Sequence, residues 1–324
     1  MAAPMSTGGK LGTAAAVVAG LGALTFGYAS VIERNAFTLR RVTAPVLPPD
    51  AEPITVLHLS DLHMAPWQRR KQAWLRSLAD LRPDVVINTG DNLGHEQGID
   101  GIRAALSVFA GIPGAFVHGS NDYYGPSAKN PFKYFTQTSS KHVSPTTLDT
   151  GALERFFMDE LGWIDLNNAV GELSVGGTRL DLFGVDDPHK HFDRLDTLTA
   201  LIDERLDAET LETDDPSLAH TVTVGVMHAP YRRVLDAFVT QGAQFIFAGH
   251  THGGQVCVPG YGALVTNCDI PRKQVKGLSV WRHALRSAYL NVSAGVGTSI
   301  YAPVRFACRP EASLVTLLPR RTVV

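Results

Sequence analysis

The chain has few cysteines and no run of basic residues. Its 324 residues include only Cys257, Cys268 and Cys308, which fit neither CxxC spacing nor a zinc knuckle and are too few for a disulfide framework. We interpret them as buried or half-buried thiols. The formal net charge is −2, so the basic surface of a dedicated nucleic-acid binder is absent and no nucleic-acid partner is predicted.

The remaining composition is that of a folded protein. Hydrophobic residues make up 44% of the chain and charged residues 19%, which is too apolar for a disordered chain and sufficient for a sizeable core. The sequence contains no internal repeat. Length alone permits one large domain or two.

An apolar segment stands at the N-terminus. Residues 11–32 contain no charged side chain, and at ~1.5 Å per residue they just span a hydrocarbon core of ~30 Å. We predict a transmembrane or signal-anchor segment over 1–32. A cleaved signal peptide and a helix lying on the membrane are the alternatives. The run continues past Ala29 without a clear cleavage box, which favours an uncleaved anchor.

Basic residues flank this segment unevenly. Lys10 precedes it, whereas Arg34, Arg40 and Arg41 follow it. The positive-inside tendency then favours a cytoplasmic position for the rest of the chain. The margin is small, so the side of the membrane stays open.

The rest of the chain divides into a short linker and one domain. The prolines between 45 and 53 predict an extended, Pro-rich linker over 33–53. Short apolar runs then alternate with helical patterns, which predicts an α/β domain over 54–324. A polar stretch at 125–150 is long for a loop, so it is either functional or mobile. The predicted strands are 54–60, 84–90, 114–120, 170–175, 180–185, 220–228, 243–249, 255–258, 263–266, 288–293 and 313–318, and the predicted helices are 68–81, 101–110 and 231–240.

Metal-binding side chains follow five of these strands. In open α/β sheets, ligands bind at the carboxyl ends of the strands. Glycines nearby let the backbone turn sharply and approach a ligand closely. The candidates are Asp61, His63, Asp91, Asn121, Asp122, His228, His250 and His252.

The spacing within these motifs has a physical reason. Residues i and i+2 of an extended chain point the same way, so Asp61 and His63 can bind one ion while Leu62 points into the core. His250 and His252 can face one site or divide between two adjacent ions. Mixed Asp, His and Asn ligands suit Mn, Fe, Zn or Co better than an all-oxygen Mg or Ca site.

The order of the motifs resembles that of the calcineurin-like metallophosphoesterase family. The motifs are D-x-H, G-D, G-x-N-D, H and G-H-x-H, and they span 61–252. The phrases GHTHGGQ, VPGYG and GVGTSIYAPVRF resemble a membrane-associated bacterial subgroup. The resemblance implies an α/β fold, a sandwich of two mixed β-sheets flanked by helices, with two divalent metal ions.

The resemblance also implies a division of the ligands between the two ions. Asp91 would bridge them, and an amide from the third motif would complete the second site. The first ion would be held by Asp61, His63, Asp91 and His252, and the second by Asp91, His228 and His250.

The third motif departs from the family pattern. The family has G-N-H-D or G-N-H-E, whereas this chain has Gly119-Ser120-Asn121-Asp122. In strict register Ser120 replaces the amide ligand and Asn121 replaces the histidine. We favour a small shift that brings the amide of Asn121 to the metal, because a serine hydroxyl is a poor neutral ligand. In either case the family's histidine, its usual proton donor, is missing.

Other side chains could take over parts of that role. Without the family's histidine, the leaving group must be good, assisted by metal, or protonated by another residue. Asn92 and Asp122 are candidates for orienting the ligands. His142, His189 and His191 are possible proton donors, and Lys129, Lys133 and Arg305 are possible phosphate contacts.

These features predict a hydrolase of phosphoesters, in the first place phosphodiesters, that acts at the membrane. Two adjacent cations would lower the pKa of a bridging water, so that hydroxide attacks phosphorus, and would neutralise phosphoryl oxygens. Asp91, Asn121 and His250 are the residues expected at the reaction centre. The alternatives are cleavage of a nucleotide–sugar pyrophosphate and a catalytically weak metal-binding scaffold. A lipid or envelope-linked phosphoester is one candidate substrate, and the natural substrate and the oligomeric state stay open.

Overall fold

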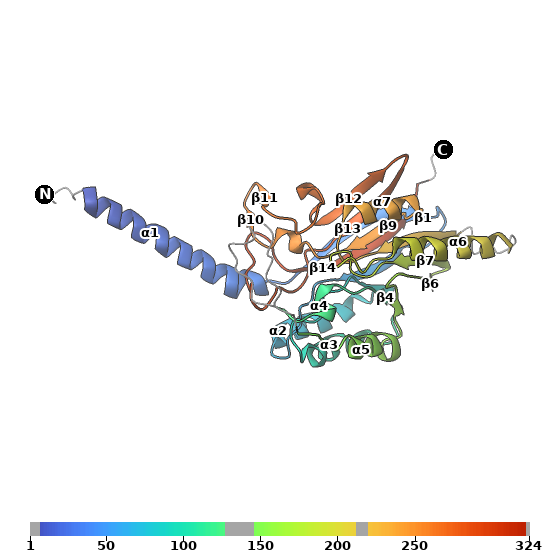
Figure 1. Ribbon diagram of the computed structural model, residues 1–324, viewed down its shortest axis with the longest axis horizontal. Coiled ribbons are helices and arrows are strands. Elements are labelled where there is room, and N and C mark those ends of the chain that lie inside the picture. The colour runs from blue at the N-terminus through green and yellow to red at the C-terminus, as the bar shows by residue number, and fades with distance from the viewer. Residues whose placement is uncertain (1–6, 127–145, 212–219, 322–324) are drawn as a thin grey trace.

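Two six-stranded mixed β-sheets lie face to face with helices on their outer sides (Figure 1). The computed structural model describes residues 7–126, 146–211 and 220–321. A long helix, α1 (Thr7–Gly27), projects from this body. The predicted fold class, a sandwich of two mixed sheets flanked by helices and preceded by one apolar helix, is confirmed.

The first sheet has the strand order β1-β14-β2-β3-β4-β5. β2 to β5 run parallel to one another, and β14 is antiparallel to β2. Near-continuous apolar runs such as ITVLHL in β2 suit strands that are covered on both faces. The strands are β1 (Thr38–Leu47), β14 (Glu311–Pro319), β2 (Ile54–Leu59), β3 (Val85–Asn88), β4 (Gly114–Phe116) and β5 (Ile164–Asp165).

The second sheet has the order β12-β13-β9-β8-β7-β6. Its four central strands are parallel, and an antiparallel strand closes each edge. The strands are β12 (Gly277–His283), β13 (Arg286–Val292), β9 (Phe245–Ala248), β8 (Thr221–Val226), β7 (Thr178–Gly184) and β6 (Ala169–Val175). A two-stranded hairpin, β10 (Cys257–Val258) and β11 (Gly262–Ala263), lies outside both sheets.

Three apolar layers hold the sandwich together. The middle layer joins the two sheets, where Val56 and Val85 belong to the same cluster as Val224 and Phe247. The outer layers pack helices onto each sheet. The first sheet is covered by α2 (Arg69–Ser77), α3 (Gly98–Leu106) and α5 (Thr150–Arg155), and the second by α6 (Leu195–Leu211) and α7 (Arg232–Thr240).

The region expected to be a linker contains a strand. β1 lies within 33–53 and runs parallel to β14, with a shift of register between Pro45 and Leu47. The linker prediction rested on four prolines, of which only Pro45 lies within β1, and it did not anticipate this pairing. β1 is the edge strand of its sheet, and an edge tolerates Pro45 because its outward N–H position needs no partner. Most of the polar stretch at 125–150 lies outside the described residues.

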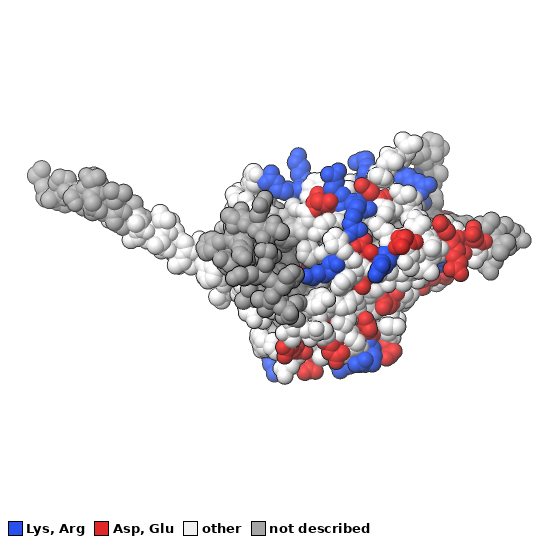
Figure 2. Space-filling model, in the orientation of Figure 1, with Lys and Arg blue, Asp and Glu red and all other residues white. Residues whose placement is uncertain are grey.

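The apolar N-terminal segment forms a helix that stands clear of the domain. A candidate membrane span covers Ala15–Asn35, and only 6% of its most apolar window is buried. In the space-filling view the described part of this helix carries no charged side chain (Figure 2). After Gly27 the helix continues as a π-helical turn, η1 (Tyr28–Ile32), and a 3-10 turn, η2 (Glu33–Asn35).

Candidate metal centre

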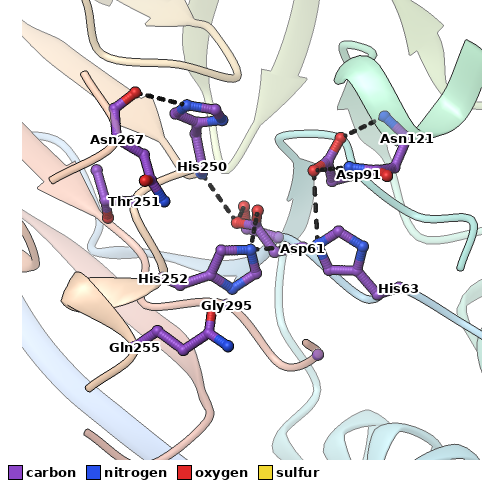
Figure 3. A network of polar contacts seen from close by, with 12 residues as sticks. Asp61, His63, Asp91, Asn121, His250, Thr251, His252, Gln255, Asn267 and Gly295 are labelled. Carbon is purple, nitrogen blue, oxygen red and sulfur yellow. Dashed lines mark hydrogen bonds and ion pairs between the residues drawn. The ribbon is translucent and has the colours of Figure 1, made fainter. Parts of the chain in front are cut away.

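The predicted ligands come together where strands of both sheets end. Asp61 and His63 follow β2, Asp91 follows β3, and His228 follows β8. The loop after β9 carries His250 and His252. Backbone hydrogen bonds join neighbouring loops. The N–H of His63 donates to the carbonyl of Asp91 at 2.9 Å, and the N–H of Gly249 donates to the carbonyl of His228 at 2.8 Å. Residues far apart in the sequence therefore share one buried cluster (Figure 3).

Two groups of side chains in this cluster could each hold a metal ion. One consists of Asp61, His63 and His252, and the other of Asp61, Asp91 and His228. In each group the ligand atoms lie within 4.8 Å of one another, and all of these residues are buried. Asp61 belongs to both groups, which places the two candidate positions side by side.

The carboxylate of Asp91 reaches toward both positions. Its Oδ2 lies 3.5 Å from Nε2 of His63, and its Oδ1 lies 3.5 Å from Nε2 of His228. This geometry suits the bridging role predicted for Asp91. Asp61 is held from the other side, because its Oδ2 accepts bonds from the hydroxyl of Ser60 at 2.6 Å and from the backbone N–H of His250 at 3.0 Å.

The donor atoms face one another in a way that fits a cation. Nε2 of His63 lies 3.2 Å from Nε2 of His252, and Nδ1 of His250 lies 3.3 Å from Nε2 of His228. Oδ1 of Asp61 is buried and has no hydrogen-bond partner among the described residues. Buried polar atoms normally have partners. Converging nitrogens and an unpartnered carboxylate oxygen therefore fit a divalent metal.

The protonation states of His63 and His250 favour metal binding, whereas, against the effect of burial, Asp91 and nearby carboxylates raise the pKa of His228 well above its usual value. Burial lowers the pKa of His63 to about 4 and that of His250 to about 3, so both rings are neutral near pH 7 and offer lone pairs. Burial also raises the pKa of Asp61, to about 6. Burial would raise the pKa of Asp91 as well, but the neighbouring His228 and hydrogen bonds hold it well below its usual value.

The backbone of the ligands is unusual. Five predicted ligands have positive φ, at 50° for Asp61, 40° for His63, 55° for Asp91, 67° for His250 and 49° for His252. Non-glycine residues rarely adopt this region, and strain of this kind gathers at functional sites.

Close packing explains two glycines beside the site. A Cβ on Gly119 would lie 2.4 Å from Oδ1 of Asp91, and one on Gly249 would lie 1.9 Å from Oγ of Ser60. Only glycine leaves room for the ligand carboxylates at these two positions.

A model of the calcineurin-like phosphoesterase family matches residues 54–254. The chain belongs to this family. It is a metal-dependent phosphoesterase, a hydrolase of ester bonds, and the resemblance drawn from its motifs is confirmed.

Known proteins similar to this phosphoesterase include bacterial and animal relatives. The metallophosphoesterase YkuE of Bacillus subtilis is 22% identical over 91% of this chain and 92% of its own length. A transmembrane protein with a metallophosphoesterase domain from Bos taurus is 25% identical over 71% of this chain and 47% of its own length. Among solved structures, a dimetal phosphatase from Danio rerio has a TM-score of 0.38 and 12% identity over 76% of this chain and 88% of that one.

In the third motif of the phosphoesterase, Ser120 and Asn121 point in different directions. Both the backbone N–H and the side-chain amide of Asn121, in the short helix α4 (Ser120–Tyr123), donate to Asp91, at 2.8 and 2.7 Å. The hydroxyl of Ser120 turns away and donates to Asp187 at 2.5 Å. The structure thus brings Asn121, and not Ser120, to the candidate ligands, although its role as a ligand stays a prediction.

Asp122 joins the second and third motifs. Its buried carboxylate accepts hydrogen bonds from the backbone N–H groups of Asp91, Asn92 and Gly119, at 2.9, 2.7 and 3.0 Å. The predicted orienting role of Asp122 therefore has a structural basis. Burial alone would lower the pKa of the adjacent His118. The hydrogen bonds to Asp122 and Glu154 outweigh that effect and raise the pKa to about 9, so this ring is charged near pH 7.

Arg305 lies elsewhere than expected. We predicted a phosphate contact, but the side chain is fully buried behind His252. Its Nη1 donates to the carbonyl of His252 at 2.9 Å, and its Nη2 lies 3.1 Å from the Nδ1 of that ring. Arg305 therefore positions His252. The other predicted phosphate contacts, Lys129 and Lys133, lie outside the described residues.

The three candidate proton donors differ in their position relative to the metal cluster. The ring of His189 lies beside that of His250, with centroids 4.6 Å apart. His191 is exposed and bonds through its backbone to Pro188. His142 lies outside the described residues.

The sequence interpretation missed several supporting groups. Asp187 is buried and accepts bonds from Ser120 and from the backbone N–H of His189. It follows β7 in the pattern that revealed the other carboxylates, so the signal for it was present. The carbonyl of Thr89, 2.7 Å from Nδ1 of His228, turns the other ring nitrogen toward Asp91. Every residue carries a backbone carbonyl, so the sequence does not indicate which one accepts such a bond.

The contrast between Asn121 and Ser120 gives a prediction. Asn121→Ala should lower metal affinity and activity by about 10- to 100-fold, as loss of a group that orients ligands does. Ser120→Ala should keep metal and activity but lower the free energy of unfolding by about 1–3 kcal/mol, because buried Asp187 loses a partner. Metal titration, turnover and urea unfolding of both variants test this. Loss of metal in Ser120→Ala with retention in Asn121→Ala would show the opposite assignment.

Proposed function

We propose that this phosphoesterase hydrolyses phosphodiesters at a membrane surface with two divalent metal ions. The observation that carries the proposal is the pair of buried ligand groups that share Asp61. Two ions, when bound there, supply a water of lowered pKa and neutralise phosphoryl oxygens. Mn, Fe, Zn and Co all suit mixed carboxylate and imidazole ligands.

The residues that would hold the ions are those of the cluster. Asp91 would set the spacing of the two positions, because its two oxygens face different histidines. Imidazoles supply the nitrogen ligands, and Asn121 supports Asp91 from the side of the third motif. The proposed ligands are Asp61, His63, Asp91, Asn121, His228, His250 and His252.

His189 is the residue we propose for protonating the leaving oxygen. Its Nδ1 lies 2.9 Å from the hydroxyl of Tyr231, so Nε2 is the ring nitrogen left to meet a substrate. The ring is exposed and adjacent to His250. A proton donor at the rim of the cluster would replace the histidine that the third motif lacks.

The membrane part of the proposal rests on α1. An exposed apolar helix long enough to cross a bilayer precedes the domain, and a relative from Bos taurus is a transmembrane protein. Phospholipids are themselves phosphodiesters, so a domain held at a bilayer surface meets this substrate class at high local concentration. Tethering supports the choice of substrate class and does not alter the chemistry.

One assay tests the activity. The full chain in detergent, loaded with Mn, should hydrolyse bis-p-nitrophenyl phosphate faster than p-nitrophenyl phosphate. Absence of turnover on either substrate, with two metals bound per chain, would contradict the hydrolase and favour a metal-binding scaffold. Faster cleavage of a nucleotide–sugar than of either ester would favour a pyrophosphate substrate.

A further inference from the structure

A basic pocket lies where α1 joins the domain. It has a volume of about 210 Å³ and opens between η2, the start of α2 and residues 296–298. Among the described residues that line it, Arg34, Arg69, Arg70 and Lys71 are basic and none is acidic. The metal cluster does not include any of these side chains.

The arginines of this pocket have no ion-pair partner in the part of the chain that the structure describes. Arg69 and Arg70 are exposed, and neither has an ion-pair partner among the described residues. Arg34 reaches a backbone carbonyl, that of Pro303, at 3.4 Å. Lys71 is buried, its Nζ donates to the carbonyl of Leu62 at 2.6 Å, and burial lowers its pKa to about 7. The positive charge that the pocket presents therefore comes from its three arginines.

The pocket has a fixed position relative to the candidate membrane span. The span Ala15–Asn35 ends at two residues that line the pocket, Arg34 and Asn35. The end of the helix is tied to the domain, because the N–H of Arg305 donates to the carbonyl of Ala29 at 3.1 Å and that of Cys308 to Glu33 at 2.7 Å. A bilayer that contains α1 would thus have its headgroups beside the pocket.

An aromatic side chain stands at the rim. Trp67 is 61% exposed and also lines the pocket. Tryptophan is enriched at the level of the headgroups, where its ring is half apolar and half polar. In Figure 1, α2 and the hairpin of β10 and β11 lie on the side from which α1 projects. Val258 and Tyr261 of that hairpin are exposed apolar residues.

We propose that this pocket binds the phosphate headgroup of an anionic phospholipid and seats the domain on the bilayer. The inference rests on the proposed membrane anchoring by α1. Basic residues next to an anionic membrane surface each strengthen attachment by roughly fivefold. Removal of two should therefore weaken lipid binding by about 25-fold. Arg69 and Arg70 are the two to remove, because both are exposed and neither supports the backbone of the metal site.

The test uses the full chain in a nonionic detergent. Short-chain phosphatidylglycerol, short-chain phosphatidylcholine and inorganic phosphate are titrated separately, and bound lipid is counted by native mass spectrometry. We expect at least tenfold tighter binding of phosphatidylglycerol than of phosphatidylcholine, and about 25-fold weaker binding of phosphatidylglycerol in Arg69→Ala/Arg70→Ala. Inorganic phosphate that binds as tightly as phosphatidylglycerol would overturn the proposal in favour of a soluble anion.

A second pocket supplies the matched control. It lies near Pro45, at the far end of β1 from α1, and contains Arg282 and Arg320. Arg282→Ala/Arg320→Ala removes the same charge and should leave lipid binding unchanged. Equal loss in both double variants, or none in Arg69→Ala/Arg70→Ala, would overturn the proposal.

Turnover of bis-p-nitrophenyl phosphate, measured in the same samples, separates this inference from the proposed function. Arg69→Ala/Arg70→Ala should retain the wild-type rate. Lipid binding that depends on Arg69 and Arg70 in a protein without turnover would uphold the pocket and contradict the activity. Turnover without selective lipid binding would uphold the activity and contradict the lipid-binding pocket.

Discussion

Asp91→Ala is expected to lower the kcat/KM of the Mn-loaded protein for bis-p-nitrophenyl phosphate by about 10³-fold. A metal centre contributes several kcal/mol of transition-state stabilisation, and each ~1.4 kcal/mol changes the rate tenfold. Asp91 has one carboxylate oxygen toward each candidate position, so its loss should disturb both. Metal content measured with the kinetics should fall below two ions per chain.

Two further variants make the Asp91 test decisive. Asp91→Asn keeps the size of the side chain and should also lose metal, with circular dichroism showing that the fold persists. Asp80→Ala removes an exposed carboxylate in the turn after α2 and should match the wild type. Asp91 variants that keep two ions and remain within about threefold of the wild-type rate would show that the reaction occurs elsewhere.

His189→Gln should produce a loss that depends on the leaving group. A general acid contributes roughly 10²–10⁴-fold when the leaving oxygen needs a proton. Hydrolysis of an alkyl diester such as glycerophosphoglycerol should therefore fall by about 10²-fold or more. Hydrolysis of bis-p-nitrophenyl phosphate should change little, because p-nitrophenolate leaves without protonation. Both substrates are compared on one preparation, by phosphorus NMR and by absorbance.

A nearby histidine controls for general effects of the substitution. His191→Gln alters an exposed ring two residues away and should leave both rates unchanged. An equal fall for the two substrates in His189→Gln would indicate damage to the metal cluster through His250. Unchanged rates for both would remove His189 from the mechanism.

Most of the fold followed from hydrophobic pattern. Runs such as ITVLHL are buried on both faces in the structure, and that environment selects the apolar side chains from which strands were predicted. β1 was missed because Pro45 and the prolines that follow the strand outweighed its pattern, and its pairing with β14 joins segments about 270 residues apart. β12 was missed too, since its charged and aromatic residues suit an exposed edge. The residues around a strand do not indicate which strand so far away in the sequence it pairs with.

The candidate site was predictable where ligands follow strands. The order of the motifs and the edge rule for α/β sheets placed Asp61, Asp91 and His250 together, and the structure brings them together. The burial of Arg305 could not be foreseen, because a guanidinium beside a substrate and one behind a ligand look the same in sequence. Its direction is set by the carbonyls of Gly295 and Gly297, which are groups every residue carries.

The positive φ angles of the five candidate ligands set a limit on engineering this protein. Each such residue holds a backbone shape that glycine or asparagine adopts at lower cost. Replacement of His250 by glycine would relieve the strain at that position but remove a predicted ligand, so a selection for heat resistance alone would not protect the site. Screens that impose turnover and heat together would keep the imidazoles and find their gains in other parts of the sandwich.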